Sequence, residues 1–215
     1  MILYKFGYYI LINKIVNNLF SITKELISRE EKEKLISQKG FCIWLTGLSG
    51  SGKTTIATNV SHRLHKQGYI TQVLDGDNIR LGINKNLSFS IEDRFENVRR
   101  TAEIAKLFIQ NGIITICCLV SPTEEIRELA KKIIGRKDFF EVFIDTSIEE
   151  CEKRDTKGLY KKARKGEINN FTGISSPFEK PKNPSLRILT EGTSIEESSS
   201  LLLKSISPKI KLSNE

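Results

Sequence analysis

An eight-residue glycine-rich segment, residues 47–54, reads GLSGSGKT and leaves few folds open to this chain. It fits the pattern G-x-x-x-x-G-K-[ST] of loops that bind nucleoside-triphosphate phosphates. The residues before it, 41–45, form an apolar run typical of a buried strand, and residues 55–67 after it favour a helix. In that setting the glycines let backbone N–H groups approach phosphate oxygens, and the positive end of the helix attracts them. A chance glycine-rich turn is the weaker interpretation, so we expect the chain to bind ATP or GTP.

The end of this loop carries the polar groups that the chemistry needs. Lys53 is expected to neutralise the β- and γ-phosphates of the nucleotide, and the Thr54 hydroxyl is expected to bind Mg²⁺. The residues expected to bind the nucleotide are Gly47, Leu48, Ser49, Gly50, Ser51, Gly52, Lys53 and Thr54. A GTPase would also carry Asn-Lys-x-Asp after a late strand, whereas Asn84-Lys85-Asn86-Leu87 lacks the Asp and lies too early. ATP with Mg²⁺ is therefore the expected nucleotide.

The rest of the chain alternates short apolar runs with helical patterns. Strands are predicted at residues 41–45, 69–74, 113–120, 139–144 and 186–189, and helices at residues 28–38, 55–67, 91–110, 122–135, 147–153 and 195–206. Residues 78–90 are predicted to be rich in loops, and residues 155–184 show no core periodicity. This alternation favours an α/β fold with a mainly parallel five-stranded sheet and helices on both faces. With the phosphate-binding loop, it predicts a P-loop NTPase fold of the kinase kind.

Composition limits the partners of the chain. A net charge of +8 suits anionic partners, and because nucleic-acid-binding motifs are absent, small phosphorylated molecules are favoured over nucleic acid. The four cysteines form no C-x-x-C pair, and Cys42, Cys117 and Cys118 fall in predicted strands as small hydrophobic residues. We therefore expect a reduced, cytoplasmic protein.

The N-terminal residues 1–24 contain no acidic side chain and match no sequence motif that we recognise. Their apolar stretch, residues 6–12, is far shorter than the roughly 20 residues that span a bilayer, so no stable membrane insertion is expected. An extension that is poorly packed or interfacial is favoured, and an organelle-targeting role stays open. The predicted catalytic domain covers residues 25–210, followed by a tail of residues 211–215.

Two carboxylates follow the second predicted strand, as Asp75-Gly76-Asp77. In open α/β sheets ligands bind at the carboxyl ends of strands, where a carboxylate can accept a hydroxyl proton or hold Mg²⁺ through water. An Asp-Gly turn in which Asp77 caps a helix is the alternative. Downstream, Arg94, Asn97 and Arg100 recur every third residue on one predicted helix face, which suits phosphate or sulfate oxygens. A solvated helix face is the plainer interpretation of these charges.

Several further segments carry a family resemblance. Residues 75–80 read DGDNIR, residues 89–90 read FS, residues 92–94 read EDR and residues 96–100 read ENVRR. Later come Ser121-Pro122, then KGLY at residues 157–160, KAR at residues 162–164 and FTGI at residues 171–174. In this order and spacing the motifs resemble those of the adenylylsulfate kinases (APS kinases), from about Glu30 to the C-terminus.

The resemblance implies phosphorylation of the 3′-hydroxyl of adenosine 5′-phosphosulfate (APS) by Mg-ATP, which yields 3′-phosphoadenylyl sulfate and ADP. It implies that Lys53, Asp77 and Ser121 are catalytic, with Asp77 beside the attacking hydroxyl and Ser121 at a position that the family is described as phosphorylating. It implies that residues 155–173 form a basic lid, and we also expect a homodimer. The residues expected to bind APS are Asp75, Asp77, Arg80, Phe89, Arg94, Asn97, Lys157, Leu159 and Phe171, with Phe89 and Phe171 on either side of the adenine.

The residues themselves qualify two of these roles. No neighbouring His or Lys is evident that would activate Ser121 as a nucleophile, so we favour direct transfer, with Ser121 capping the helix after Pro122. Phe171 lies in a polar segment without periodicity, which argues against a place in a core. Two other functions remain open: a nucleoside or sugar kinase of the same fold, and a catalytically inactive nucleotide-sensing module. Lys53, Thr54 and Asp77 argue against the second.

Overall fold

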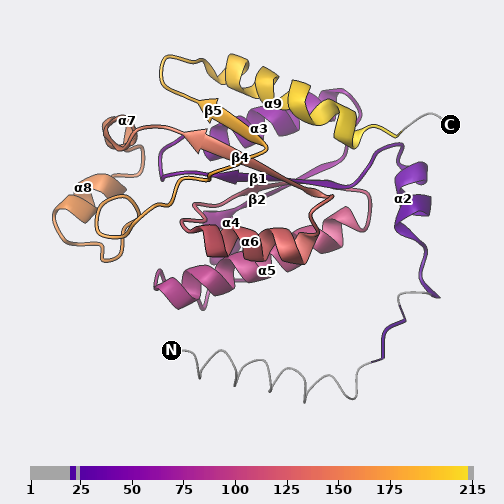
Figure 1. Cartoon of the computed structure of the whole chain (residues 1–215), viewed down its shortest axis with the longest axis horizontal. Helices are drawn as coiled ribbons and strands as arrows, with labels where there is room; N and C mark the ends of the chain where they lie inside the picture. The colour runs from indigo at the N-terminus through magenta and orange to yellow at the C-terminus, as the bar shows by residue number, and fades with distance from the viewer. Residues whose placement is uncertain (1–19, 23–24, 213–215) are drawn as a thin grey trace.

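The computed structural model describes residues 20–22 and 25–212, and its centre is a five-stranded sheet (Figure 1). The strands pair in the order β2-β3-β1-β4-β5, and each pairing is parallel. Their bounds are β1 (Phe41–Thr46), β2 (Thr71–Asp75), β3 (Ile114–Cys118), β4 (Phe139–Asp145) and β5 (Leu186–Leu189). The predicted α/β fold with a parallel five-stranded sheet is confirmed.

Helices cover both faces of this sheet. One face carries α3 (Lys53–Lys66) and α9 (Ile195–Ile210), and the other carries α5 (Ile91–Ile109) and α6 (Glu124–Ile134) (Figure 1). Each face has its own cluster of buried apolar side chains, one built with α3 and α9 and the other with α5 and α6. The shorter helices are α2 (Arg29–Leu35), α4 (Gly76–Leu81), α7 (Ile148–Arg154) and α8 (Leu159–Arg164).

The sequence explains why these elements form where they do. Every residue of β1 and β3 is buried, because central parallel strands are covered on both faces and therefore need continuous apolar runs. The outer helices α2 and α9 begin with capping boxes, in which Ser28 pairs with Glu31 and Ser194 pairs with Glu197. These local signals agree with the periodic patterns, which is why most predicted elements lie within a few residues of the observed ones.

Two short helices lie where the sequence predicted irregular structure. The first, α4, begins at the end of β2, where the Asp75 side chain accepts hydrogen bonds from Asp77 N and Asn78 N. The second, α8, lies within residues 155–184 and buries Tyr160 and Ala163. The prediction of irregular structure is wrong at both places. Six residues make fewer than two helical turns, so a 3.6-residue periodicity has too little length to emerge.

The segment expected to be a lid, residues 155–173, carries α8 and lies beyond the carboxyl ends of the strands (Figure 1). Of the predicted N-terminal extension, residues 1–24, the structure describes only residues 20–22, and of the predicted tail only residues 211–212, so both predictions lie mostly outside the described residues. Within the described part of the chain, no helix has the length and apolar character to cross a membrane. All four cysteines are free and buried, as the sequence predicted for Cys42, Cys117 and Cys118.

Candidate active site

A cavity of about 580 Å³ lies at the carboxyl ends of the strands. Its walls come from the glycine-rich loop, the end of β2 with α4, the start of α5, the residues after β3, and residues 154–157. The chain passes from β1 over β3 to reach β2, so the strand order reverses beside β1. Ligands of open parallel sheets bind at such a reversal. Motifs that are separated by more than 100 residues in the sequence therefore share one cavity.

The glycine-rich loop has the backbone that only glycines supply. Gly47 has a φ of 150°, and a Cβ atom there would lie 2.5 Å from the carbonyl oxygen of Ile144. Gly52 has a φ of 103° and precedes α3 without a side-chain cap. The first backbone N–H groups of α3 are thus left as donors at the positive end of the helix. A loop of this kind binds an anion through its backbone.

Lys53 is the first residue of α3, and its side chain turns back into the loop. Its Nζ donates hydrogen bonds to the carbonyl oxygens of Gly47 at 2.9 Å and Leu48 at 2.6 Å. The residue is only 8% exposed, and burial lowers the pKa of Lys53 to about 8. Because desolvation disfavours the charged ammonium, a bound anion would strengthen the hold of Lys53 on its proton.

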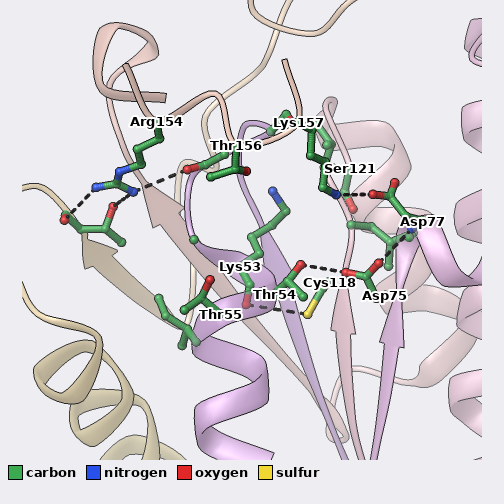
Figure 2. Close-up of a pocket in the computed structure, with 18 of the residues that line it drawn as sticks. Lys53, Thr54, Thr55, Asp75, Asp77, Cys118, Ser121, Arg154, Thr156 and Lys157 are labelled. Carbon is green, nitrogen blue, oxygen red and sulfur yellow. Dashed lines mark hydrogen bonds and ion pairs between the residues drawn. The ribbon is translucent and has the colours of Figure 1, made fainter. Parts of the chain in front are cut away.

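Thr54 and Asp75 connect the glycine-rich loop with the end of β2. The Thr54 hydroxyl donates to Asp75 Oδ2 at 2.8 Å, while Asp75 Oδ1 accepts from Asp77 N at 3.0 Å (Figure 2). A hydroxyl and a carboxylate are the hard oxygen ligands that suit Mg²⁺. Residues 20–22 and 25–212 hold no cluster of three or more His, Cys, Asp or Glu side chains suited to a metal. This donor set therefore fits an ion that is bound largely by nucleotide phosphates and water.

Asp77 lies on the first turn of α4 and forms an ion pair with Lys157 of the lid segment (Figure 2). The two side chains remain 61% and 59% exposed, so the pair stays in contact with solvent. The hydrogen bond to Asp77 raises the pKa of Lys157. The predicted catalytic carboxylate and a predicted substrate-binding lysine thus meet across the cavity.

Two arginines and one aromatic ring form a further group in the cavity lining. The Arg80 guanidinium lies over the ring of Phe89, 4.5 Å from its centroid, and donates to Ser88 O at 2.7 Å. Arg94 lies 5.8 Å from the same centroid and reaches the lid segment, donating to Thr172 Oγ1 at 2.8 Å. Burial lowers the pKa of both Arg80 and Arg94, since charged groups lose hydration there. These guanidiniums therefore present positive charge beside the cavity.

Of the three residues spaced at intervals of three on α5, two line the cavity. Arg94 and Asn97 do so, whereas Arg100 turns toward Glu96, with Nε 2.7 Å from Glu96 Oε1, and toward Asn86. The helical spacing predicted the shared face correctly for Arg94 and Asn97. For Arg100 the plainer interpretation, a charge paired on the surface of the helix, is the better one.

The lid segment and α7 share a small hydrophobic cluster, which corrects the interpretation of Phe171. Phe171 is 9% exposed and packs edge-on against Tyr160, with ring centroids 4.9 Å apart, in a cluster that includes Cys151 and Ala163. The expectation that Phe171 stands outside a core is wrong, because the cluster is assembled from residues spread between Cys151 and Phe171 rather than from one periodic element. Leu159 packs against the same cluster. The predicted site residues outside the cavity lining are Gly47, Leu48, Ser51, Leu159 and Phe171.

Ser121 lines the cavity after β3, but it does not cap α6. The side chain that accepts a hydrogen bond at the start of α6 belongs to Thr123, so the predicted capping role of Ser121 is wrong. The Ser121 side-chain oxygen instead accepts a hydrogen bond from Trp44 Nε1 at 3.0 Å, and Arg127 Nη1 donates to its carbonyl oxygen at 2.9 Å. Ser121 has a φ of 44°, so these contacts hold it in a backbone conformation that is uncommon for serine.

Arg154 is a cavity residue that sequence reasoning missed. It ends α7 and lies in the cavity lining (Figure 2). Its guanidinium donates to Thr190 O and Thr190 Oγ1, both at 3.2 Å, and to Ser51 O at 3.4 Å. It therefore joins the glycine-rich loop to the segment after β5. In the sequence it is one of many basic residues near the lid, and no spacing rule distinguishes it.

Comparisons with known proteins agree with this geometry. Residues 39–189 match the family model described as "Adenylylsulphate kinase". The adenylyl-sulfate kinase of Bacteroides thetaiotaomicron is 57% identical over 194 residues, which cover 90% of this chain and 96% of that protein. The APS kinase of Mycobacterium tuberculosis in complex with AMPPNP and APS gives a TM-score of 0.76 at 46% identity, covering 79% of this chain and 98% of that one. A hexameric APS kinase from Thiobacillus denitrificans gives a TM-score of 0.62 at 26% identity, covering 84% of this chain and 32% of that one. The matched range includes the glycine-rich loop, α4, α5 and the lid segment.

Proposed function

This chain belongs to the adenylylsulfate kinase family, and we propose that it transfers the γ-phosphoryl group of ATP to the 3′-hydroxyl of APS, forming 3′-phosphoadenylyl sulfate and ADP in sulfate activation. The observation that carries this proposal is the shared cavity. A loop suited to nucleotide phosphates, a carboxylate on α4, and a group of arginines with Phe89 all line this cavity. Donor and acceptor nucleotides would therefore meet in one cavity.

At the donor end, the glycine-rich loop would hold the ATP phosphates. The Lys53 ammonium would exchange its contacts with the Gly47 and Leu48 carbonyl oxygens for phosphate oxygens. Mg²⁺ would be held by the Thr54 hydroxyl, with Asp75 close to it, and would supply charge neutralisation on the β- and γ-phosphates. Arg154 is a further group that we assign to this end, because it lies beside the loop at Ser51.

At the acceptor end, Asp77 would accept the proton of the 3′-hydroxyl. The hydroxyl oxygen then forms a bond to the γ-phosphorus while the bond between that phosphorus and the β,γ-bridging oxygen breaks, and ADP leaves with the bridging oxygen. Positioning and charge stabilisation account for most of the acceleration in such transfers. Lys157 holds Asp77 before the acceptor binds. We propose that Lys157 turns to the APS anion when the hydroxyl takes its place beside Asp77.

The remaining wall would bind the rest of APS. Arg80, Arg94 and Asn97 offer donors for phosphosulfate and ribose oxygens, and the exposed Phe89 ring offers a surface for the adenine. Phe171 would complete the adenine sandwich only if its ring turned from the Tyr160 cluster toward the cavity. Leu159, in the same cluster, would move with it. We therefore propose that residues 155–173 rearrange as a lid when both nucleotides bind.

Direct transfer is the route we propose, without a phosphoserine intermediate. The Ser121 hydroxyl oxygen already accepts a hydrogen bond from Trp44 Nε1, which draws electron density from the oxygen and makes it a weaker nucleophile. No side chain recorded within the described residues accepts its proton as a base would. We therefore assign Ser121 a structural role near the γ-phosphate of ATP and not the role of a nucleophile that becomes phosphorylated.

The assay of this function is a comparison of acceptors. Purified protein with ATP and Mg²⁺ is offered APS, adenosine, gluconate or no acceptor, and ADP formation is followed. We expect rapid ADP formation with APS alone, and its loss in Lys53→Ala run beside the wild type. Faster turnover with adenosine or gluconate would assign the chain to another small-molecule kinase activity. Binding of ATP without ADP formation under any condition would instead support a regulatory module.

Assembly and location complete the proposal. We propose that the chain forms a homodimer, and sedimentation equilibrium tests this. A hexamer, such as that of the Thiobacillus denitrificans protein, would overturn the proposal. We propose a cytoplasmic location, which the four free, buried cysteines support because reducing compartments preserve thiols. Neither nucleic acid nor a membrane is a partner in this proposal.

A further inference from the structure

Asn84 is fully buried and does not line the cavity, yet it contacts Asn97, which does. Its side-chain nitrogen, Nδ2, donates to Asn97 Oδ1 at 2.9 Å and approaches the Asn97 carbonyl oxygen at 3.4 Å. Asn84 follows α4, where its N–H donates to Ile79 O at 2.9 Å and its carbonyl accepts from Leu87 N at 3.0 Å. The segment that begins at Asp77 is thereby tied to the middle of α5.

These contacts fix the orientation of both amide groups. The carbonyl oxygen of Asn97 can only accept, so the Asn84 atom that faces it must be the NH₂ group. The same NH₂ group faces the Asn97 side chain, which must therefore present its oxygen to Asn84. Turning the Asn97 amide over would bring two NH₂ groups together. Asn97 Nδ2, the remaining group of the side chain, is then held as a donor on the side away from Asn84.

The arrangement does not maximise stability. Asn84 Oδ1 is buried and, within the described part of the chain, has no hydrogen-bond partner. Such a group lowers stability, because its desolvation is not offset. Asn97 is 5% exposed but lines the cavity. Local arrangements that lower stability are expected where function requires them. A fully buried asparagine that leaves its own oxygen unpaired while fixing a neighbour that lines the cavity fits a positioning role.

We propose that Asn84 is a positioning residue for the acceptor, which locks the Asn97 amide so that its NH₂ group faces an oxygen of APS. This inference rests on the proposed function, since it assumes that APS binds against α5. All of the sulfate, phosphate and ribose oxygens of APS accept hydrogen bonds, so a fixed donor favours them. An Asn97 amide free to rotate would present its oxygen to the anion in part of the population, and would bind APS less well.

The test measures steady-state kinetics for both substrates. Asn84→Ala should raise the KM for APS about ten-fold, with the KM for ATP within about two-fold of the wild type, because one charge-assisted hydrogen bond loses its orientation. Asn84→Asp is nearly isosteric and directs oxygens at Asn97, so it should turn the Asn97 NH₂ group away from the cavity and raise the KM for APS further. The matched control is Thr101→Val, which removes the 2.7 Å hydrogen bond from a buried hydroxyl to the Asn97 carbonyl oxygen. The control should leave the KM for APS within about two-fold of the wild type.

A double-mutant cycle separates positioning from general disruption. In an Asn97→Ala background, replacing Asn84 should have no further effect on the KM for APS, because the group through which it acts is gone. Independent, multiplicative effects would overturn the proposal, as would a wild-type KM for APS in Asn84→Asp. If Asn84→Ala fails to fold, the isosteric Asn84→Asp decides the question alone. A wild-type protein that does not phosphorylate APS would instead refute the proposed function itself.

Discussion

Replacing Asp77 with Asn separates catalysis from folding more cleanly than other changes in this cavity. Asn keeps the size and shape of the side chain but does not accept the hydroxyl proton. General-base catalysis contributes about 10²–10⁴-fold to rate, so kcat should fall by about that factor. The affinity for ATP should change little, because Asp77 is assigned to the acceptor hydroxyl rather than to the nucleotide phosphates.

The structure sets the expected effect on stability. The Asp77 and Lys157 side chains are 61% and 59% exposed, and an ion pair this exposed contributes about 0–1 kcal/mol. For a domain of this size, 1 kcal/mol corresponds to a shift of about 2–4 °C in Tm. Asp77→Asn should therefore melt close to the wild type. A loss of two or more orders of magnitude in kcat would then have a catalytic cause.

The assay combines kinetics with thermal melting, and Glu152→Gln is the matched control. Glu152 pairs with Arg164 of the lid segment at 2.7 Å, Arg164 is also 59% exposed, and Glu152 lies outside the cavity lining. The control should retain wild-type kcat and KM. If Asp77→Asn retained kcat while its KM for ATP rose steeply, Asp77 would help to bind Mg-ATP. Its assignment as the general base would then be refuted. An equal loss of kcat in Glu152→Gln would mean that any change in the charge pairing of the lid segment lowers kcat, and that Asp77 has no special catalytic role.

The remaining predictions concern the loop, the lid and Ser121. Lys53→Ala should lower kcat by about 10²–10³-fold, since one donor to developing charge is lost; near-normal turnover would exclude this loop from catalysis. Because burial lowers the pKa of Lys53 to about 8, part of the lysine population is deprotonated near pH 8, and ATP binding there should cause net proton uptake in titration calorimetry with buffers of different ionisation enthalpy. Uptake that persists in Lys53→Ala would assign the proton elsewhere. Phe171→Ala should raise the KM for APS, since base stacking is worth about 1–3 kcal/mol, and residues 155–173 should resist protease only when both nucleotides are bound. Protection without nucleotides would mean that the segment is rigid. Ser121→Ala should keep most activity, with chiral γ-phosphate transferred with inversion, whereas retention together with an inactive variant would establish a covalent route.

The parts of the fold that could be predicted are those that depend on residues close together in the sequence. The glycine-rich loop between β1 and α3 is specified by residues 47–54, and the continuous apolar run of β3 follows from its burial on both faces. The predicted span of β5, Leu186–Leu189, is also confirmed. Where the signal lies within one short segment of the chain, that segment's own sequence suffices.

The parts that could not be predicted depend on contacts between distant residues. Phe171 reads as a loop residue because its partners, Tyr160 and Cys151, come from α8 and α7. Ser121 was expected to cap a helix because Pro122 follows it, but the helix begins later, at a cap formed by Thr123. The Arg154 guanidinium is positioned by its hydrogen bond to Thr190, which lies 36 residues away in the sequence. Single-sequence patterns carry no information on such pairings.

The proposed reaction moves the γ-phosphoryl group of ATP to one particular hydroxyl of APS, the 3′-hydroxyl. The most direct measurement supplies γ-³²P-ATP and APS to the purified protein with Mg²⁺, isolates the labelled product, and treats it with a 3′-nucleotidase. We predict that one label is transferred per ADP formed and that the 3′-nucleotidase releases all of it, regenerating APS. Label that resists the nucleotidase, or label released as inorganic phosphate without transfer to APS, would show that the chain does not phosphorylate the 3′-hydroxyl of APS.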